Sequence, residues 1–427
     1  MDGILLLHGF ILGMIALACW LFHLRVRHGL MFDAVSVSWM GYVIFVAGAV
    51  AGASTYGPFR PNREIASYTI FIIYLGTFAY FLGLLIRPGY RAMARLIPTP
   101  HDVLTKAMAW FLWFLLIFIW GSGYLLLQFM PYGFRNISFM MVMGGVGGSA
   151  AIAIYILTAV RGSFLSKFFM ALHLGFVLFF LVNVAFSRRF APGILLGLFL
   201  FFYHVRMRHS SIQKRAMSIT IALLVGVLAV ALLSAYRQKR VWGAEMRSLA
   251  DKDLWIGMVS GTAVQYIVLE FTVANYPDNY AYLNGSGIVP LLTFPVLRAV
   301  WPNKPLPSGS VISRRYLGNK AVDEYNASVF NTIIGEFYMN FGPMGVPLCM
   351  FLVGIFISAV NHVLITHVDN MTLMVAWLVL IPHWMTEWRG DLNSTTVMAL
   401  AVVSMLLGLS WLLGKVYRPA SKTAWDA

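Results

Sequence analysis

The sequence predicts an all-α, polytopic membrane protein with about eleven transmembrane helices. Of its 427 residues, 60% are hydrophobic and only 11% are charged, whereas soluble domains average about 25% charged residues. The mean hydropathy is +0.77. Apolar runs of roughly 20 residues recur along most of the chain. Each is long enough to cross a bilayer as a helix, which satisfies its own backbone hydrogen bonds.

Eleven apolar runs, bounded by charged residues or by Gly and Pro, are the candidate membrane helices. They cover residues 4–24, 34–53, 67–86, 107–129, 139–160, 168–186, 193–205, 217–236, 341–365, 371–386 and 397–414. The first run is too long for a cleavable signal peptide and lacks basic residues before it. We expect one integral membrane domain over 1–427, with 237–340 as a large loop between the eighth and ninth helices.

The distribution of Lys and Arg predicts the orientation in the membrane. One set of connections, together with the C-terminal segment, holds fifteen of these residues, and the opposite short loops hold six. Because cytoplasmic loops carry the excess of positive charge, the first set is expected inside the cell. The N-terminus and the 237–340 loop then lie outside, and the C-terminus lies in the cytoplasm.

One further stretch, 254–273, is apolar enough to be a twelfth span but contains Gln265 and Glu270. If it crossed the membrane, the basic C-terminal segment would move outside. We therefore expect a helix that lies at the outer interface or packs on the bundle.

The net charge of +15 does not indicate nucleic-acid binding, because the basic residues are spread between membrane helices instead of forming one stripe. The sequence also lacks the motifs of several enzyme classes. It has no Walker motif, no HExxH and no GxSxG, which argues against an ATPase, a zinc protease and an α/β hydrolase. Two cysteines inside apolar runs offer no disulfide framework and no CxxC metal site. Glycines 144, 145, 147 and 148 indicate close packing between helices.

The 237–340 loop is the candidate functional region, since it holds ten basic residues and half of the sixteen carboxylates of the chain. In its stretch 294–309, Arg298 is followed after ten residues by Gly309. Prolines stiffen the stretch, and a fixed Arg can bind two phosphate oxygens while Lys304 adds a point charge. Solvated charges beside lipid headgroups, with Trp301 at the interface, are the alternative.

Glu336 lies near a predicted membrane boundary, one helical turn from Asn340 and two residues from Tyr338. Low dielectric would raise the pKa of such a carboxylate, which suits a general base. The alternative is a helix-capping or interface carboxylate. The outer-end arginines Arg188, Arg189 and Arg389 are a further signal, because Arg is disfavoured outside. They are either functional or snorkel to headgroup phosphates.

In their order, these features resemble the bacterial O-antigen polymerases of the Wzy type. The features are SRR at 187–189, LRAVWPNKP at 297–305 within the Arg-x10-Gly spacing, GEFYMNFGPMG at 335–345 and RGD at 389–391. The resemblance covers the topology of the chain, but the motifs are confined to about sixty residues. The family often has a second Arg-x10-Gly in an earlier outer loop, whereas here Arg188 and Arg189 have Phe and Leu at that spacing.

The resemblance implies a metal-independent membrane glycosyltransferase of the GT-C type in the bacterial inner membrane, without a soluble cofactor. It would transfer a glycan from one undecaprenyl pyrophosphate to the terminal sugar of another lipid-linked repeat unit. Implied partners are a flippase and a chain-length regulator. Glu336 would be the base and Arg298 a second catalytic residue. The implied pyrophosphate ligands are Arg188, Arg189, Arg298, Lys304 and Arg389. The implied sugar contacts are Tyr280, Tyr282, Trp301, Tyr338 and Asn340, and the structural positions are Pro302, Pro305 and Gly309.

Two other functions stay open from the sequence. An O-antigen ligase, which passes the same glycan to lipid A core, would have similar loops. A flippase or transporter of charged lipids should instead place charges near the midplane of its spans and show internal repeats. The predicted spans are nearly free of charge, which favours an enzyme with its site at the outer surface.

Overall fold

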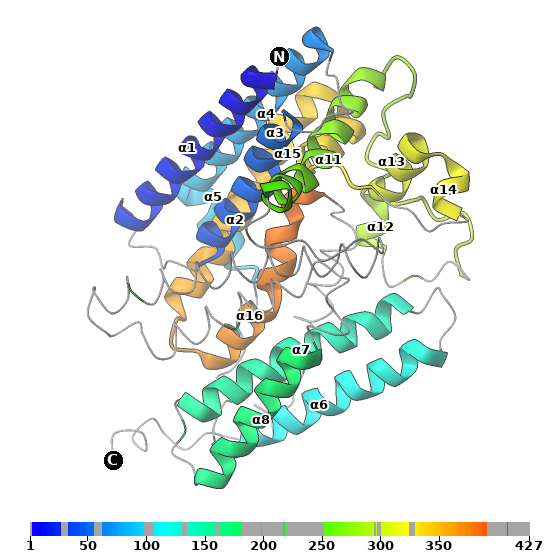
Figure 1. Cartoon of the computed structure of the whole chain (residues 1–427). Helices are drawn as coiled ribbons and strands as arrows, with labels where there is room; N and C mark the ends of the chain where they lie inside the picture. Colours follow the sequence, from blue (N-terminus) through cyan, green and yellow to red (C-terminus); the bar gives the residue numbers. More distant parts are fainter. Residues whose placement is uncertain are drawn as a thin grey trace. The chain divides into compact units, whose positions relative to one another are not determined.

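The structure is a computed structural model of the whole chain (Figure 1). It describes residues 2–26, 33–54, 62–97, 99, 106–129, 135–158, 160, 163–180, 198, 217, 252–293, 296, 300–323, 329–390 and 408. These residues form helices joined by turns and extended connections, and this part of the chain contains no strand.

The helices run from α1 to η5 in chain order. Their bounds are α1 (Asp2–Val26), α2 (Ala34–Tyr42), η1 (Val43–Ala47), α3 (Gly48–Ala53), α4 (Arg63–Leu85), α5 (Arg87–Ala94), α6 (Lys106–Phe129), α7 (Arg135–Thr158), α8 (Phe164–Phe180), α11 (Lys252–Asn275), α12 (Val289–Leu292), α13 (Ser308–Leu317), α14 (Asn319–Asp323), α15 (Ile333–Thr366), α16 (Met371–Thr386) and η5 (Glu387–Arg389).

Among the described helices, five stretches are long and apolar enough to cross a membrane. They are Gly3–Arg25, Ala34–Ala53, Arg63–Leu85, Met108–Leu126 and Ile333–Thr366. Three predicted spans, at 193–205, 217–236 and 397–414, fall outside the described residues except for single positions. The total of eleven spans therefore stays a prediction.

The helix predicted over 341–365 begins earlier than expected, at Ile333, and is interrupted at Gly342. Gly342 has φ of 71°, a conformation that only glycine adopts readily. The residues from Ile333 up to this break are helical and do not form an irregular loop before the membrane span. As a result, Glu336 lies on a helix and not in a loop.

The chain divides into two compact units. The first consists of Met1–Ile97, Ala250–Thr366 and Trp384–Val397, and the second of Pro98–Leu249, His367–His383 and Met398–Ala427. This division does not test the prediction of one membrane domain over 1–427 with a 237–340 outer loop, which stays a prediction.

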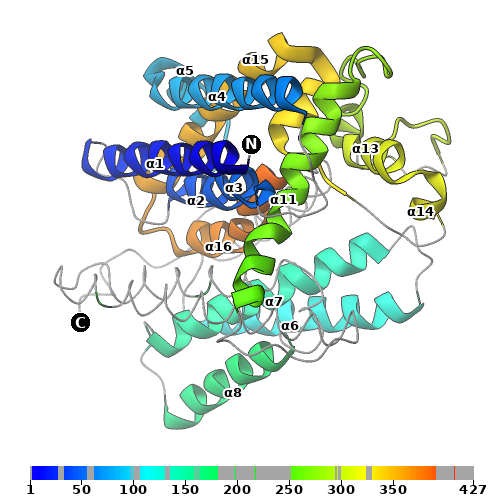
Figure 2. The ribbon, with the colours of Figure 1, turned by 45° about the horizontal axis from the view of Figure 1, so that its top comes forward.

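In the first unit, α15 packs closely along α4, and glycines make the close approach possible. A Cβ on Gly83 would lie 2.1 Å from the carbonyl oxygen of Phe351, and one on Gly354 would lie 2.3 Å from that of Tyr80. Small residues of this kind let helices approach closely in membranes, where packing must hold the helices together because no hydrophobic effect drives their association. Helices α1 and α4 run alongside each other (Figures 1 and 2).

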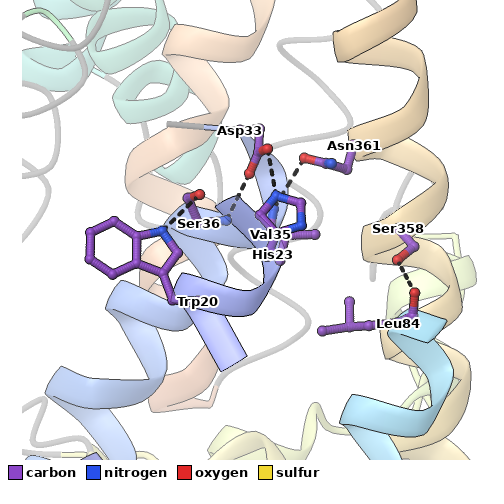
Figure 3. Close-up of polar contacts among 8 residues, drawn as sticks. All are labelled: Trp20, His23, Asp33, Val35, Ser36, Leu84, Ser358 and Asn361. Carbon is purple, nitrogen blue, oxygen red and sulfur yellow. Dashed lines mark hydrogen bonds and ion pairs between the residues drawn. The ribbon is translucent and has the colours of Figure 1, made fainter. Parts of the chain in front are cut away.

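Polar contacts join α1 and α15 to the start of α2, and Ser358 of α15 donates to the carbonyl oxygen of Leu84 in α4 at 2.9 Å (Figure 3). The side chain of Asp33 caps α2 by accepting from Ser36 N at 2.9 Å, and it also pairs with His23 Nε2 of α1 at 2.7 Å. Asn361 of α15 accepts from Val35 N at 3.4 Å. These contacts fix the end of the unit that the charge distribution assigns to the cytoplasm.

Helix α11, which contains the ambiguous stretch 254–273, packs against α3, α4 and α15. Its described side chains from Ala263 onward are largely buried, including Val268 and Leu269. Packing on the bundle agrees with one of the two arrangements expected for this stretch. Helices α11 and α13 lie near the end of the unit at which α1 and α4 begin (Figure 2).

In the second unit, α6 and α7 are held together by small residues. A Cβ on Gly145 would lie 2.8 Å from the carbonyl oxygen of Leu116, and one on Gly148 would lie 3.0 Å from the Leu116 side chain. The predicted role of the glycines at 144–148 in helix packing is thus confirmed for these two positions.

Candidate active site

Glu336 lies in the first helical segment of α15, with only 1% of its surface exposed. The segment starts at two buried polar residues: Thr332 Oγ1 accepts from Gly335 N at 3.1 Å, and Asn331 Oδ1 accepts from Thr332 N at 3.0 Å. A Cβ on Gly335 would lie 1.9 Å from Asn331 Oδ1, so this start requires glycine there. The local sequence therefore fixes where the carboxylate sits.

The segment that carries Glu336 ends at Gly342, beside a tyrosine of the preceding loop. A Cβ on Gly342 would lie 3.0 Å from Tyr282 Cζ. Pro343 follows directly and offers no backbone N–H to continue the helix. The break separates a short segment, which holds the polar residues, from the long apolar part of α15.

Arg389 is held by its neighbour Trp388. The indole N–H of Trp388 donates to Ser38 Oγ at 2.9 Å. Its ring packs edge-on against Tyr42 and Tyr80, with centroids 5.0 and 5.1 Å apart. These contacts anchor η5 to α2 and α4.

The segment that leads into α15 contacts both Arg389 and the residue after it. The guanidinium of Arg389 lies over the ring of Phe330, 4.9 Å from its centroid. Gly390 has φ of 88°, and a Cβ there would lie 1.6 Å from the carbonyl oxygen of Asn331. The structure thus brings the RGD stretch next to the start of the Glu336 segment, although the two are about fifty residues apart in the sequence.

Three predicted sugar contacts form one cluster with Tyr276, a residue that was not predicted. Tyr276 stacks on Tyr282 with ring centroids 6.3 Å apart and contacts Tyr280 at 5.7 Å. Tyr282 in turn meets Tyr338 edge-on at 6.2 Å. We call Tyr276, Tyr280, Tyr282 and Tyr338 the tyrosine cluster.

Arg315 of α13 completes this cluster with a positive charge. Its guanidinium lies 5.0 Å from the ring centroid of Tyr276 and 4.5 Å from that of Tyr280, and it donates a hydrogen bond to the Tyr276 hydroxyl. Burial raises the pKa of Tyr276 to about 12, although the positive charge of Arg315 opposes this shift. Tyr276 therefore stays a neutral phenol whose oxygen can accept from Arg315.

Asn340 is a junction between three segments. Its Nδ2 donates to Ser308 Oγ at 3.0 Å and to the carbonyl oxygen of Glu336 at 2.8 Å, while its Oδ1 accepts from Gly287 N at 3.2 Å. The residue is fully buried. These contacts suit a role in positioning the loop around Glu336, whereas the sequence suggested contact with a sugar.

Lys304 closes a small loop with its own chain. Its ammonium donates to the carbonyl oxygens of Thr293 at 2.7 Å and Val296 at 3.1 Å. A turn from Trp301 to Lys304 contains the exposed Pro302, and Pro305 follows it. Lys304 thus ties the turn that begins at Trp301 to the backbone at Thr293 and Val296.

Gly309 lies buried in the first turn of α13, where its carbonyl oxygen accepts from Ser313 Oγ at 2.8 Å. The predicted cations Arg188, Arg189 and Arg298 lie outside the described residues. Of the predicted cations, the structure therefore places Arg389 and Lys304.

Glu270 of α11 is a second buried carboxylate at this end of the unit. It accepts from the backbone N–H of Asn62 at 3.2 Å, and Asn62 caps the start of α4. Burial raises the pKa of Glu270 to about 7, and the hydrogen bond from Asn62 opposes the shift. Its contact with the residue before the Arg63–Leu85 span places it at the boundary of the membrane region.

The family model of O-antigen polysaccharide polymerase Wzy matches residues 191–415, which is more than half of the chain. The chain belongs to this family. No curated protein and no solved structure gives a match. Together with the apolar helices, membership identifies a multi-pass membrane protein with a glycosyltransferase-like polymerase activity.

The matched region of the Wzy family includes α11, the tyrosine cluster, Glu336 and Arg389, while Arg188 and Arg189 lie just before it. Sequence reasoning missed Tyr276 and Arg315. The spacing of three tyrosines around a proline, in YPDNYAY at 276–282, was the available signal for Tyr276. Arg315 carried no signal, because its role depends on how α13 folds back on this loop.

Proposed function

We propose that this Wzy-family protein is an O-antigen repeat-unit polymerase whose general base is Glu336. It transfers a glycan from one undecaprenyl pyrophosphate-linked chain to the terminal sugar of another lipid-linked repeat unit. The observation that carries the proposal is the position of the Glu336 carboxylate. It is buried in a short helical segment that adjoins both the tyrosine cluster and the segment under Arg389.

In the proposed step, an acceptor hydroxyl oxygen attacks the anomeric carbon of the donor sugar. The bond between this carbon and the pyrophosphate oxygen breaks, and the bond electrons leave with the lipid pyrophosphate. Glu336 takes the proton of the attacking hydroxyl. Because Glu336 is almost fully buried, the acceptor has to displace part of the surrounding loop to reach it.

The leaving pyrophosphate develops negative charge, which fixed cations at the outer surface stabilise. We assign this role to Arg298, Arg188, Arg189 and Arg389, each charge-assisted contact contributing about 1.5–3 kcal/mol. Among them, Arg298 is proposed as the second catalytic residue, as the family resemblance implies. Lys304 supports it by bonding to the carbonyl oxygens of Thr293 and Val296, Pro302 and Pro305 stiffen the chain around Lys304, and Gly309 begins α13 after it.

The sugar of the acceptor is proposed to pack against Tyr280, Tyr282 and Tyr338. Arg315 and Tyr276 hold two of these rings in place, and Asn340 holds the loop. A rigid aromatic surface of this kind binds the apolar face of a sugar at little entropic cost.

We further propose that the protein is a GT-C-type enzyme with about eleven spans in the bacterial inner membrane. Its N-terminus is outside and its C-terminus in the cytoplasm. A flippase supplies lipid-linked repeat units to the outer leaflet, and a chain-length regulator limits the product. The reaction needs no metal and no soluble cofactor.

Deletion of the gene, followed by gel analysis of the surface polysaccharide, tests the proposal. A polymerase predicts that the ladder collapses to a single attached repeat unit. Loss of all attached units would instead indicate a ligase. Accumulation of lipid-linked units on the cytoplasmic side would indicate a flippase. Complementation with the wild-type gene has to restore the ladder in each case.

A further inference from the structure

The loop over residues 289–306 exposes apolar side chains although it lies outside the candidate spans. Leu292 is 80% exposed and Val300 is 77% exposed. Val296, Trp301 and Leu306 are each exposed by more than a third. Large apolar side chains that gather in an exposed stretch of chain indicate a site of interaction with a protein or a membrane. We call these five residues the apolar patch.

The apolar patch is presented by a fixed piece of chain. The ammonium of Lys304 bridges the carbonyl oxygens of Thr293 and Val296, which draws the two ends of the loop together. Lys304 N also donates to the Trp301 carbonyl oxygen at 3.1 Å. The contacts of Lys304 therefore restrain the backbone at Thr293, Val296 and Trp301, next to exposed side chains of the patch, which lowers the entropic cost of binding.

Both stems of this loop are tied to the same point of α15. Gly287 N and Ser308 Oγ bond to Asn340, and Ser308 N donates to the Gly287 carbonyl oxygen at 3.3 Å. Asn340 immediately precedes Phe341, the first member of an exposed apolar stripe on α15. The stripe consists of Phe341, Met344, Leu348, Leu352 and Phe356.

The spacing of four residues places Met344, Leu348, Leu352 and Phe356 on one face of the helix, and Phe341 precedes them across the break at Gly342. Because Ile333–Thr366 is a candidate span, the face is the one that meets lipid. The stems of the loop are therefore anchored at Asn340, next to the position where the exposed apolar side chains of α15 begin.

Charge identifies the partner. Between Asp278 and Asp323 the chain contains no carboxylate, whereas it contains five cations, at Arg298, Lys304, Arg314, Arg315 and Lys320. A second copy of the protein would bring an equal positive charge against this surface. Anionic phospholipid headgroups complement it, and apolar side chains flanked by cations are typical of segments that bind at a membrane interface.

We propose that the apolar patch inserts into the outer-leaflet interface of a bilayer with anionic phospholipids. Trp301, which the sequence suggested for sugar binding, then serves as an interfacial anchor. The loop holds the outer-surface site at a constant height above the membrane. This inference stands whether the enzyme is a polymerase or a ligase.

Depth-dependent quenching tests the insertion. Cys19 and Cys349 are replaced by Ala, and single cysteines are introduced as Leu292→Cys and Val300→Cys for labelling with an environment-sensitive fluorophore. The matched controls are Asp278→Cys and Asn319→Cys, two exposed polar positions outside the loop. Each protein is placed in nanodiscs with plain or brominated phosphatidylglycerol.

We expect brominated lipid to quench the labels at 292 and 300 but not those at 278 and 319. Introducing Val300→Asp beside a label at Leu306→Cys should abolish quenching there, while Asn319→Asp should not. Phosphatidylcholine discs and high salt should weaken quenching at 292 and 300. Equal quenching at all four positions would overturn the proposal. Labels at 292 and 300 that are shielded from an aqueous quencher but not quenched by brominated lipid would also overturn it. That result would indicate a second copy or a substrate on the patch.

Discussion

Glu270 and Glu336 are two buried carboxylates at the same end of one helical unit, and their surroundings give them different roles. Glu336 belongs to the segment that adjoins Arg389 and the tyrosine cluster, whereas Glu270 bonds to the cap of α4. The raised pKa of Glu270 makes the stability of the folded state depend on pH. The folded protein holds this proton to a higher pH than the unfolded chain does.

Glu270 should therefore make stability fall as pH rises from the unfolded pKa of about 4.3 to the folded pKa of about 7. Below that window its stabilising contribution is fully present. Glu270→Gln cannot ionise, so the variant should lose this part of the pH dependence and be more stable than wild type above pH 7. Thermal unfolding in detergent between pH 5 and 8 measures this. Parallel pH profiles for the two proteins would contradict the assignment.

Arg315 is a positioning residue in this account, because it contacts the tyrosines and not the reacting atoms. Arg315→Lys keeps the charge but loses the planar stacking. We expect KM for the acceptor to rise roughly twofold to thirtyfold, since a cation–π contact contributes about 0.5–2 kcal/mol. The turnover number should change little. A fall in kcat at unchanged KM would show that Arg315 acts on the chemical step.

At the scale of elements, the apolar runs 34–53 and 371–386 coincide with helical stretches of the structure, because the chain marks their ends clearly. Asp33 supplies a cap just before Ala34, which is a signal readable from sequence. The start of α15 was not predicted, since Ile333–Phe341 mixes polar and apolar residues and the break at Gly342 depends on a backbone conformation.

In the candidate site too, single residues could be predicted from the sequence, whereas contacts between distant residues could not. Glu336 and Arg389 could be predicted as candidates because a carboxylate and an arginine stand out in an apolar chain. The junction at Asn340 joins residues 53 positions apart, and the Trp388 anchor to Ser38 joins residues 350 positions apart. Contacts of this range follow from helix packing, which one sequence does not reveal.

The contact between α1 and α2 offers a test of this packing. Asp33→Ala removes the cap of α2, at a cost of about 1 kcal/mol, and leaves a ring nitrogen of the buried His23 without its partner, at a cost of about 1–3 kcal/mol. Asp33→Asn can still cap the helix and should cost less. The shift in Tm of each purified variant measures the difference. Equal shifts would mean that the cap contributes nothing and that the pairing with His23 accounts for the whole loss.

At the scale of the whole molecule, the orientation rests on the excess of Lys and Arg on one side of the predicted spans. A cysteine at Asn319, an exposed position of α14, should react with an impermeant thiol reagent from outside the cytoplasmic membrane. One at Ser211 should react only after the membrane is permeabilised. The reverse pattern would overturn the orientation and, with it, the outer location of the site.

In the proposed reaction, Glu336 removes the proton of the acceptor hydroxyl in a metal-independent transfer. Purified protein in nanodiscs, supplied with a lipid-linked repeat unit and EDTA, tests this claim most directly through the rate at which the unit is extended. Wild type and Glu270→Gln should extend it at similar rates near pH 7. Glu336→Gln should be folded and bind the substrate, yet extend it about 10²–10⁴-fold more slowly. A fully active Glu336→Gln variant, or wild-type activity that EDTA abolishes, would contradict the account.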